Sequence, residues 1–197
     1  MDMTSIAHHP LAALLTDPVI APYVPWIAAV PDVLSPAECA ATIARIEALG
    51  PTPAGILGPG GERMNTQYRD NDRAMFEDPA LAAMLWTRLA SVVPPARRAV
   101  GLNERFRGYR YDVGQKFAAH LDGTVALPGR HSELTVLVYL NEDCEGGQTR
   151  FVQWNVAVRP RRGLALLFQH DVFHEGCEVR GGRKYVLRSD VMVRSTR

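Results

Sequence analysis

The chain has 197 residues, with 22 Lys or Arg against 21 Asp or Glu, so its formal net charge is +1. This length fits one domain of generous size, or two very small ones, and can bury a core without disulfides or structural zinc. The near-zero charge argues against a nucleic-acid binder, which usually carries a basic surface, and no apolar run approaches the ~20 residues of a membrane span. We therefore expect neither nucleic acid nor a membrane as a partner.

The cysteines and the first ten residues bear on the cellular compartment. Cys39, Cys144 and Cys177 are widely spaced, odd in number and form no Cys-x-x-Cys motif, so we interpret them as reduced thiols. Residues 1–10 lack the basic-then-apolar layout of a signal peptide. Together these features predict a cytoplasmic protein.

Two helices are predicted in the first half of the chain. Prolines are dense before residue 35, so residues 1–34 are expected to form a short helix followed by extended chain. The run Ser35-Pro36-Ala37-Glu38 combines a serine N-cap, a proline at the first helical position and a glutamate at the third. The helix that it begins should stop at Gly50-Pro51. Asp78 is the expected cap of a second helix over residues 79–92.

The segment between these helices is predicted to be a loop. Residues 51–63 are rich in glycine and proline, which favours a loop over a regular element. The polar run of residues 62–73 follows directly, and a long polar loop before a barrel mouth often serves as a lid. Residues 1–99 are therefore expected to supply helical support and a lid loop.

After about residue 100 the sequence changes character. Short β-rich segments follow one another, separated by clusters of Gly, Pro, Asp and Asn, at residues 105–113, 133–141, 148–154, 164–168 and 183–193. Many short strands at such spacing predict a sandwich or barrel. A jelly roll, in which two antiparallel sheets face each other, is the natural closure at this size. The expected fold class is mostly β with N-terminal helices, with the jelly-roll core in residues 100–197.

Three residues have the chemistry of a metal site. In the run His120-Leu121-Asp122 an imidazole and a carboxylate stand two positions apart, and such residues share one face of a strand. His174 lies in a later β segment. Two histidines and one carboxylate form the facial triad of non-haem Fe(II) oxygenases, which leaves three coordination positions open. The alternative for the pair alone is a surface turn, and for His174 alone a hydrogen-bonded histidine.

A longer pattern surrounds this pair. The run Tyr111-Asp-Val-Gly-Gln-Lys-Phe-Ala-Ala-His-Leu-Asp122 resembles the Tyr-x-x-Gly-Gln-x-aromatic-x-x-His-x-Asp run of the prolyl 4-hydroxylase-like Fe(II)/2-oxoglutarate dioxygenases. Further segments similar to that family follow in the same order, at residues 134–141, 145–151, 160–168 and 174–184. Lys184 stands ten residues after the second histidine, as in collagen-type and algal-type prolyl hydroxylases. The resemblance is strong over residues 100–193 and holds only in outline before them.

The resemblance implies a jelly-roll fold and an Fe(II) ion held by His120, Asp122 and His174. It implies 2-oxoglutarate and O2 as co-substrates, with Lys184 as the cation for the remote carboxylate of 2-oxoglutarate. Even-numbered side chains from 184 to 188 share one strand face, so Arg188 joins Lys184 there as a candidate for a carboxylate of the co-substrate or of the substrate. The alternative is that this face is solvent and Lys184 an ordinary surface cation.

Three further residues are candidates for the 2-oxoglutarate pocket. Tyr139 matches the position that supplies a hydroxyl to the remote carboxylate in related enzymes. Tyr111 matches the position that approaches the metal-bound end, and Thr149 is a third lining candidate. Aromatic core packing is the alternative for both tyrosines.

The implied reaction converts 2-oxoglutarate and O2 to succinate and CO2 while an unactivated C–H bond is hydroxylated. Related halogenases lack the carboxylate ligand, so Asp122 favours hydroxylation. The expected substrate is a prolyl residue, a free amino acid or a small metabolite. Candidates for gripping its carboxylate or peptide backbone are Arg69, Arg73, Arg107 and Arg110.

Two other interpretations of the motif are a nucleic-acid or other demethylase of the same chemistry and a cupin-type metal-binding protein that does not use 2-oxoglutarate. Demethylases carry a different, arginine-rich tail after the second histidine, and the charge balance here is neutral. The spacing of Lys184 and the run Gly146-Gly147-x-Thr149 argue against the cupin. The sequence leaves the oligomeric state open.

Overall fold

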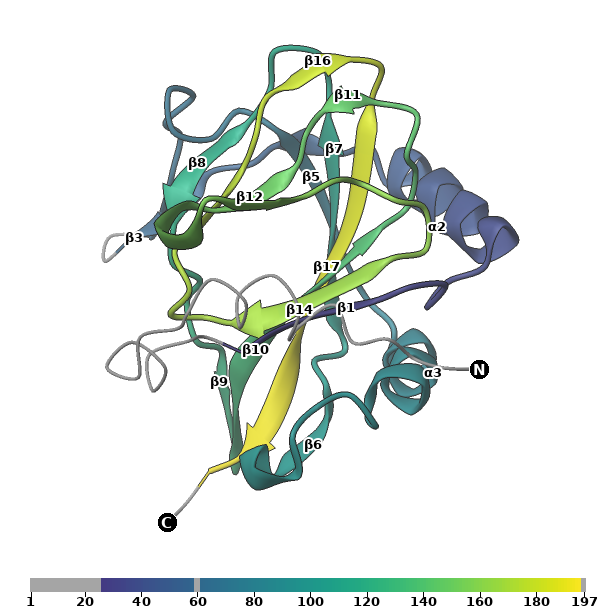
Figure 1. Cartoon of the computed structure of the whole chain (residues 1–197), viewed down its shortest axis with the longest axis vertical. Coiled ribbons are helices and arrows are strands. Elements are labelled where there is room, and N and C mark those ends of the chain that lie inside the picture. The colour runs from purple at the N-terminus through teal and green to yellow at the C-terminus, as the bar shows by residue number, and fades with distance from the viewer. Residues whose placement is uncertain (1–25, 59–60, 196–197) are drawn as a thin grey trace.

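The computed structural model describes residues 26–58 and 61–195 (Figure 1). The short helix expected near the N-terminus lies outside the described residues. Within them the chain forms two α-helices, two 3-10 helices and a set of antiparallel strands. No helix of these ranges has the length and apolar run that crossing a bilayer takes.

A large antiparallel sheet is the main structural layer. Its strands run in the order β1 (Ile27–Val30), β14 (Ala165–Gln169), β10 (Arg130–Tyr139), β17 (Lys184–Arg194), β7 (Arg105–Tyr111), β5 (Asp72–Glu77) and β2 (Thr52–Pro53). Two further strands pair off this path, β6 (Ala99–Leu102) with β17 and β9 (Ala126–Leu127) with β10. The long central strands β10 and β17 match the β segments expected at 133–141 and 183–193.

A smaller antiparallel sheet forms the second layer of the β body. Its order is β13 (Val156–Val158), β12 (Thr149–Phe151), β15 (His174–Gly176) and β8 (Phe117–His120). The pair β11 (Glu145–Gly146) and β16 (Val179–Gly181) extends this side, where Figure 1 shows it above β12. The expected strand at 148–154 is shorter than predicted, because a 3-10 helix, η4 (Val152–Trp154), follows β12. The mostly β, jelly-roll fold class is confirmed.

Two hydrophobic clusters lie on opposite faces of the large sheet. The alternation of β10 divides them, because Leu134, Val136 and Val138 belong to the cluster shared with the helices, whereas Leu137 and Tyr139 belong to the one between the sheets. In the inter-sheet cluster the rings of Phe151 and Phe168 meet edge to face at 5.3 Å. The clusters thus hold three layers together: helices, large sheet and small sheet.

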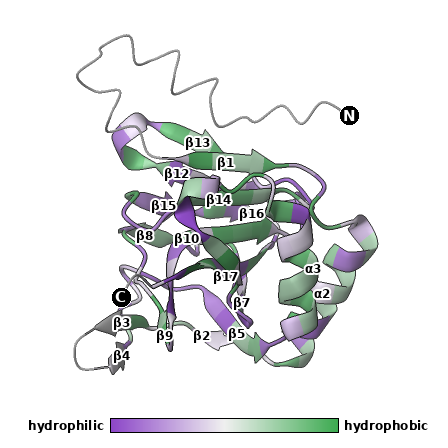
Figure 2. Ribbon diagram, turned by 90° about the horizontal axis from the view of Figure 1, so that it is seen from below, coloured by the Kyte–Doolittle hydropathy of each residue, from purple (hydrophilic) through white to green (hydrophobic). Residues whose placement is uncertain are grey.

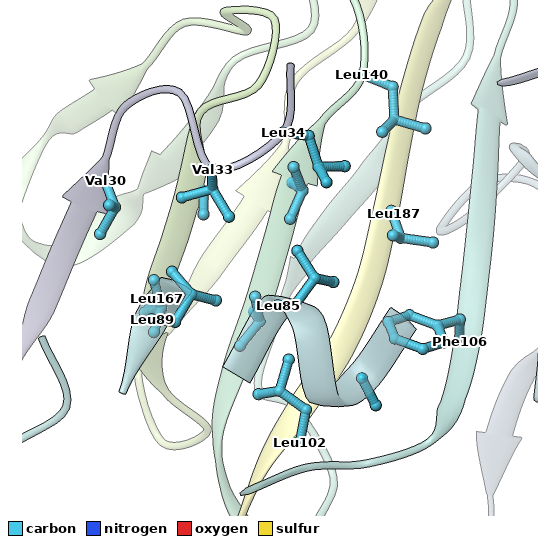
Figure 3. Packing of buried hydrophobic residues seen from close by; sticks show 14 of the residues in the cluster. Val30, Val33, Leu34, Leu85, Leu89, Leu102, Phe106, Leu140, Leu167 and Leu187 are labelled. Atoms are coloured by element: carbon cyan, nitrogen blue, oxygen red, sulfur yellow. The ribbon is translucent and has the colours of Figure 1, made fainter. Parts of the chain in front are cut away.

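The two helices cover the outer face of the large sheet, side by side (Figure 2). Figure 3 shows their cluster, in which Leu85 and Leu89 of α3 pack among Phe106, Leu167 and Leu187 of the strands. α2 (Pro36–Ala48) begins at the predicted capping box, where the Glu38 amide donates to Ser35 Oγ at 3.3 Å. α3 (Pro79–Leu89) begins at its predicted Asp78 cap and ends three residues earlier than expected.

The region expected to be only support and lid also supplies strands. Residues 51–63, predicted as a loop, contain β2 and a hairpin of β3 (Ile56–Gly58) and β4 (Gly61–Arg63). Gly61 takes a positive φ of 94° at this hairpin, which glycine adopts without strain. β5 begins within the expected lid and pairs with β7 along its whole length. Its polar start was misleading because Asp72 is neutralised across the sheet by Arg110 at 2.6 Å.

We predict that Gly108→Ala destabilises the protein by about 1–3 kcal/mol, the range for overpacked cores. A Cβ on Gly108 of β7 would lie 2.4 Å from Ile46 Cγ1 of α2, and Ile46 is fully buried. The measurement is urea unfolding of the wild type, of Gly108→Ala, of Ile46→Ala and of the double variant. The double variant should be less destabilised than the sum of the two single changes, and simple additivity would contradict the close packing of α2 on β7.

Candidate metal and co-substrate site

The pairing of β8 with β15 places the two candidate histidines opposite each other. His120 is the last residue of β8, His174 is the first of β15, and the two are direct antiparallel partners. Asp122 follows β8 in a loop rather than sharing its face, and its amide donates to the His170 carbonyl at 3.0 Å. His120 Nε2 lies 3.8 Å from Asp122 Oδ1, and His174 Nε2 lies 3.6 Å from Oδ2. One ligand atom from each of the three residues thus lies within 4.8 Å of the others.

Both imidazoles are oriented by their own backbone. Nδ1 of His120 is 2.8 Å from the Ala118 carbonyl oxygen, and Nδ1 of His174 is 2.9 Å from that of Val172. Since a carbonyl can only accept, we assign the ring proton to Nδ1 in both residues, which leaves a lone pair on each Nε2. These are the atoms that converge with the carboxylate. Such orienting bonds are the usual outer support of metal-binding histidines.

The protonation states also suit a cation. Burial, followed by the proximity of His174, lowers the pKa of His120 to about 4, and burial lowers the pKa of His174. Burial alone would raise the pKa of Asp122, but the charge of Arg188 outweighs it and the pKa lies below its usual range. At neutral pH the cluster therefore offers two neutral imidazoles and one carboxylate.

Two neighbours that the sequence analysis did not assign to this site fix the carboxylate and one imidazole. Thr135 of β10 is fully buried and donates its hydroxyl to Asp122 Oδ2 at 2.5 Å. Phe117 stacks on the His120 ring, with centroids 3.6 Å apart. Thr135 lies in the family-like segment of residues 134–141, but no feature of the sequence singled it out. Phe117 was visible only as the aromatic position of the family run.

Lys184 lies in the same pocket as the triad, which is also lined by Tyr111 and Thr149. Its side chain is buried, with 2% exposure, and forms no ion pair with any carboxylate of the described residues. The ammonium lies 4.7 Å from the ring of Tyr111 and 5.8 Å from that of Tyr139. The solvent-face alternative is therefore wrong: even-numbered residues of β17 point into the pocket. Burial lowers the pKa of Lys184 to about 8.

The remaining predicted residues divide between the two ends of the pocket. Tyr139 donates its hydroxyl to Thr149 Oγ1 at 2.7 Å, at the Lys184 end. Arg188 lies at the triad end, where its Nη2 is 2.9 Å from Asp122 Oδ1 and 3.2 Å from Asp190 Oδ1. Among the arginines expected to grip substrate, Arg110 is instead held by Asp72 and Glu47.

The donor set fits the iron site that the sequence predicts. Two imidazole nitrogens and one carboxylate oxygen are the ligands of non-haem Fe(II) sites with open positions, whereas structural zinc prefers four closed ligands. The second end of the pocket holds a buried cation without a counter-charge, which suits a dianionic co-substrate. Both halves of the predicted site are therefore present in one pocket.

We predict that Thr135→Val weakens metal binding about 10- to 100-fold, the usual effect of removing support for a ligand. Valine keeps the shape of threonine but cannot donate to Asp122. The measurement is titration of the protein with Mn(II) by calorimetry, without 2-oxoglutarate. Thr149→Val, a matched change at the other end of the pocket, should leave Mn(II) affinity unchanged. Equal affinities of wild type and Thr135→Val would show that this hydrogen bond does not support the carboxylate.

Comparison with known proteins agrees with this geometry. Residues 106–189 match the family model of the 2OG-Fe(II) oxygenase superfamily. A probable prolyl 4-hydroxylase 11 of Arabidopsis thaliana is 39% identical over a segment covering 33% of this chain and 24% of that protein. Prolyl 4-hydroxylase 2 of the same plant is 32% identical over 39% of this chain and 37% of its own length. The chain therefore matches only 24% to 37% of the length of these curated relatives.

Solved structures share the fold over most of the chain. The 2OG complex of the viral collagen prolyl hydroxylase from Paramecium Bursaria Chlorella virus-1 is 18% identical, with a TM-score of 0.64 over 86% of this chain and 96% of that one. A Pseudomonas putida prolyl-4-hydroxylase is 19% identical, with a TM-score of 0.61 over 86% and 93%. Residues 106–189 of this chain thus resemble the 2OG-Fe(II) oxygenase superfamily, and the chain is similar to prolyl 4-hydroxylases.

Proposed function

We propose that this protein is an Fe(II)- and 2-oxoglutarate-dependent oxygenase that hydroxylates an unactivated C–H bond of a prolyl residue, a free amino acid or a small metabolite. The observation that carries the proposal is the pocket itself, in which His120, Asp122 and His174 converge at one end and the unpaired Lys184 lies at the other. The superfamily uses Fe(II), 2-oxoglutarate and O2. When bound, they supply the oxidative decarboxylation of 2-oxoglutarate to succinate and CO2, coupled to insertion of one oxygen atom into the substrate.

The protein's own residues bind and position. The triad offers three ligand atoms on one side and leaves the side toward the pocket open. The Lys184 ammonium is the group to receive the remote carboxylate, and the Tyr139 and Thr149 hydroxyls lie beside it at this end. Its burial excludes water, so a single ion pair there is stronger than at the surface. Arg188 is already engaged by Asp122 and Asp190, which favours Lys184 over Arg188 as the clamp.

The two rival interpretations receive less support. A cupin-type metal protein needs the triad but has no use for a buried lysine beside it, because an unpaired buried cation is destabilising unless a ligand compensates it. The relatives found are prolyl 4-hydroxylases, which favours hydroxylation over demethylation. We also propose a cytoplasmic location, which the three free cysteines support.

The central test of this function is His174→Ala. We expect the wild type, loaded anaerobically with Fe(II) and 2-oxoglutarate, to show the weak visible absorption band of this family's complexes, and His174→Ala to lose it because one of the three ligands is gone. His131→Ala is the matched control, since His131 lies at the start of β10 near Ser195, outside the pocket. A wild type that shows neither the band nor succinate release on admission of O2 would contradict the proposed function.

The proposed binding of the remote 2-oxoglutarate carboxylate by Lys184 is tested with the variant Lys184→Met and with the pH dependence of binding. Removing the buried ammonium should weaken 2-oxoglutarate binding by about 2 kcal/mol or more, over tenfold, with Mn(II) binding intact. In the wild type, the Kd for 2-oxoglutarate should be constant below pH 8 and rise by up to about tenfold per pH unit above it. Above pH 8 the lysine of the free protein is neutral, so it has to take up a proton before it can pair with the carboxylate. The pKa values of Cys144, Cys177, Tyr111 and Tyr139 are raised, so these neighbours of Lys184 do not titrate near pH 8. Tyr109, which also lines the pocket, has a pKa lowered to about 8, so the pH dependence is assigned to Lys184 only if Lys184→Met abolishes it.

Lys116→Met is the control, because Lys116 is exposed and is the only other lysine of the chain. It should bind 2-oxoglutarate like the wild type, with the same pH profile. A Lys184→Met protein with unchanged 2-oxoglutarate affinity would assign the remote carboxylate to another residue.

A further inference from the structure

A second cavity, of about 590 Å3, opens beside the triad and shares His120, Asp122 and Arg188 with the metal pocket. We call it the arginine pocket, because five arginines line it: Arg69, Arg73, Arg105, Arg107 and Arg188. They come from β5, β7, β17 and the segment before β5. Two of the three triad residues line this cavity, so a substrate of the proposed reaction that binds in it would lie beside the triad.

The arginine pocket is rich in positively charged side chains. Among the described residues that line it, Asp122 is the one carboxylate. Asp190 lies behind the wall, fully buried, and pairs with Arg107 at 3.1 Å and Arg188 at 3.2 Å. Arg107 and Arg188 are thus compensated within the protein by a buried carboxylate. The pKa of Tyr109, which also lines this cavity, is consistent with this positive charge. Burial would raise that pKa, but the charges of Arg69, Arg188 and Arg107 lower it to about 8.

Arg69 is the residue for which the protein offers no counter-charge. Its side chain is buried, with 5% exposure, and forms no ion pair with a carboxylate of the described residues. Its Nε donates to Asn71 Oδ1 at 2.8 Å, whereas its buried Nη2 has no hydrogen-bond partner. A buried charged donor without a hydrogen-bond partner is destabilising, so a ligand that pairs with it would be stabilised at this position.

The guanidinium of Arg69 is also held rigidly near the reacting centre. It lies 4.3 Å from the ring of Phe117 and 4.7 Å from that of Tyr109. Phe117 in turn stacks on His120 at 3.6 Å. Arg69 is therefore two stacking steps from a metal ligand. Arg188, on the triad side of the cavity, likewise has a buried Nε without a partner.

We propose that the substrate is a carboxylate-bearing molecule whose carboxylate binds Arg69 in the arginine pocket, so that a neighbouring C–H bond lies before the triad. This inference rests on the proposed function and narrows its substrate class. A planar carboxylate matches the guanidinium fork and supplies the charge that Arg69 lacks. A neutral prolyl residue within a chain would leave that cation unpaired.

The test compares acids with their uncharged amides. The protein is loaded anaerobically with Mn(II) and 2-oxoglutarate, and N-acetyl-L-proline, N-acetyl-L-leucine and N-acetyl-L-phenylalanine are titrated by calorimetry, each against its primary amide. We expect at least one acid to bind about tenfold or more tightly than its amide, the effect of one buried charged hydrogen bond. If no acid binds more tightly than its amide, the proposal is wrong. Tighter binding of phenyl phosphate than of every acid would overturn the carboxylate assignment.

Variants locate the effect. Arg69→Gln should bring the acid and amide affinities together while Mn(II)-dependent binding of 2-oxoglutarate stays as in the wild type. Arg105 is exposed and lines the same cavity, so Arg105→Gln is a second test variant in case Arg69→Gln folds poorly. It should also reduce the preference for the acid over its amide. Arg159→Gln is the control, since Arg159 is exposed and does not line the cavity. An undiminished preference for the acid in both pocket variants would contradict the role of these arginines.

The two proposals fail in different ways. If the wild type does not bind 2-oxoglutarate in a metal-dependent manner, the proposed function is wrong, whatever the acids do. If 2-oxoglutarate binds and the acids show no preference, only the substrate class is wrong.

Discussion

The antiparallel pairing of β8 with β15 is the constraint on which the site depends. It sets His120 directly opposite His174, although the two lie far apart along the chain. Each ring is then oriented by a hydrogen bond to a carbonyl of its own segment, and Phe117 stacks on the ring of His120, so that both Nε2 atoms point toward Asp122. A slip of this register by one residue would send one imidazole to the opposite face of the sheet.

Strand β17 connects the core to the chemistry. Its odd-numbered residues Tyr185 and Leu187 join the hydrophobic cluster under the helices, and the even-numbered Lys184 and Arg188 enter the pocket. Burying these cations costs solvation free energy that the apolar side of the same strand helps to offset. The helices therefore support the site indirectly, because they pack against β17, the strand that carries Lys184 and Arg188.

The metal pocket and the arginine pocket, which share His120 and Asp122, contain two kinds of positively charged residue. Arg188 and Arg107 are compensated within the protein by Asp122 and Asp190. Lys184 in the metal pocket and Arg69 in the arginine pocket have no such partner among the described residues. Compensated charges hold the ligands in place, whereas uncompensated ones are available to bind anions. Under the proposed function, the first anion is the co-substrate and the second is the substrate.

The sequence by itself determined the helix starts, the jelly-roll class and the triad with its lysine, because capping, strand alternation and motif spacing are local patterns. Only the tertiary structure decided what depends on partners distant in the chain. The polar start of β5 becomes a strand because Arg110 neutralises Asp72 across the sheet. Arg188 is drawn to Asp122 rather than to the co-substrate end, and Arg69 becomes a buried, unpaired cation between two rings. A sequence shows which residues are charged, but whether each charge has an oppositely charged partner depends on its neighbours in the tertiary structure.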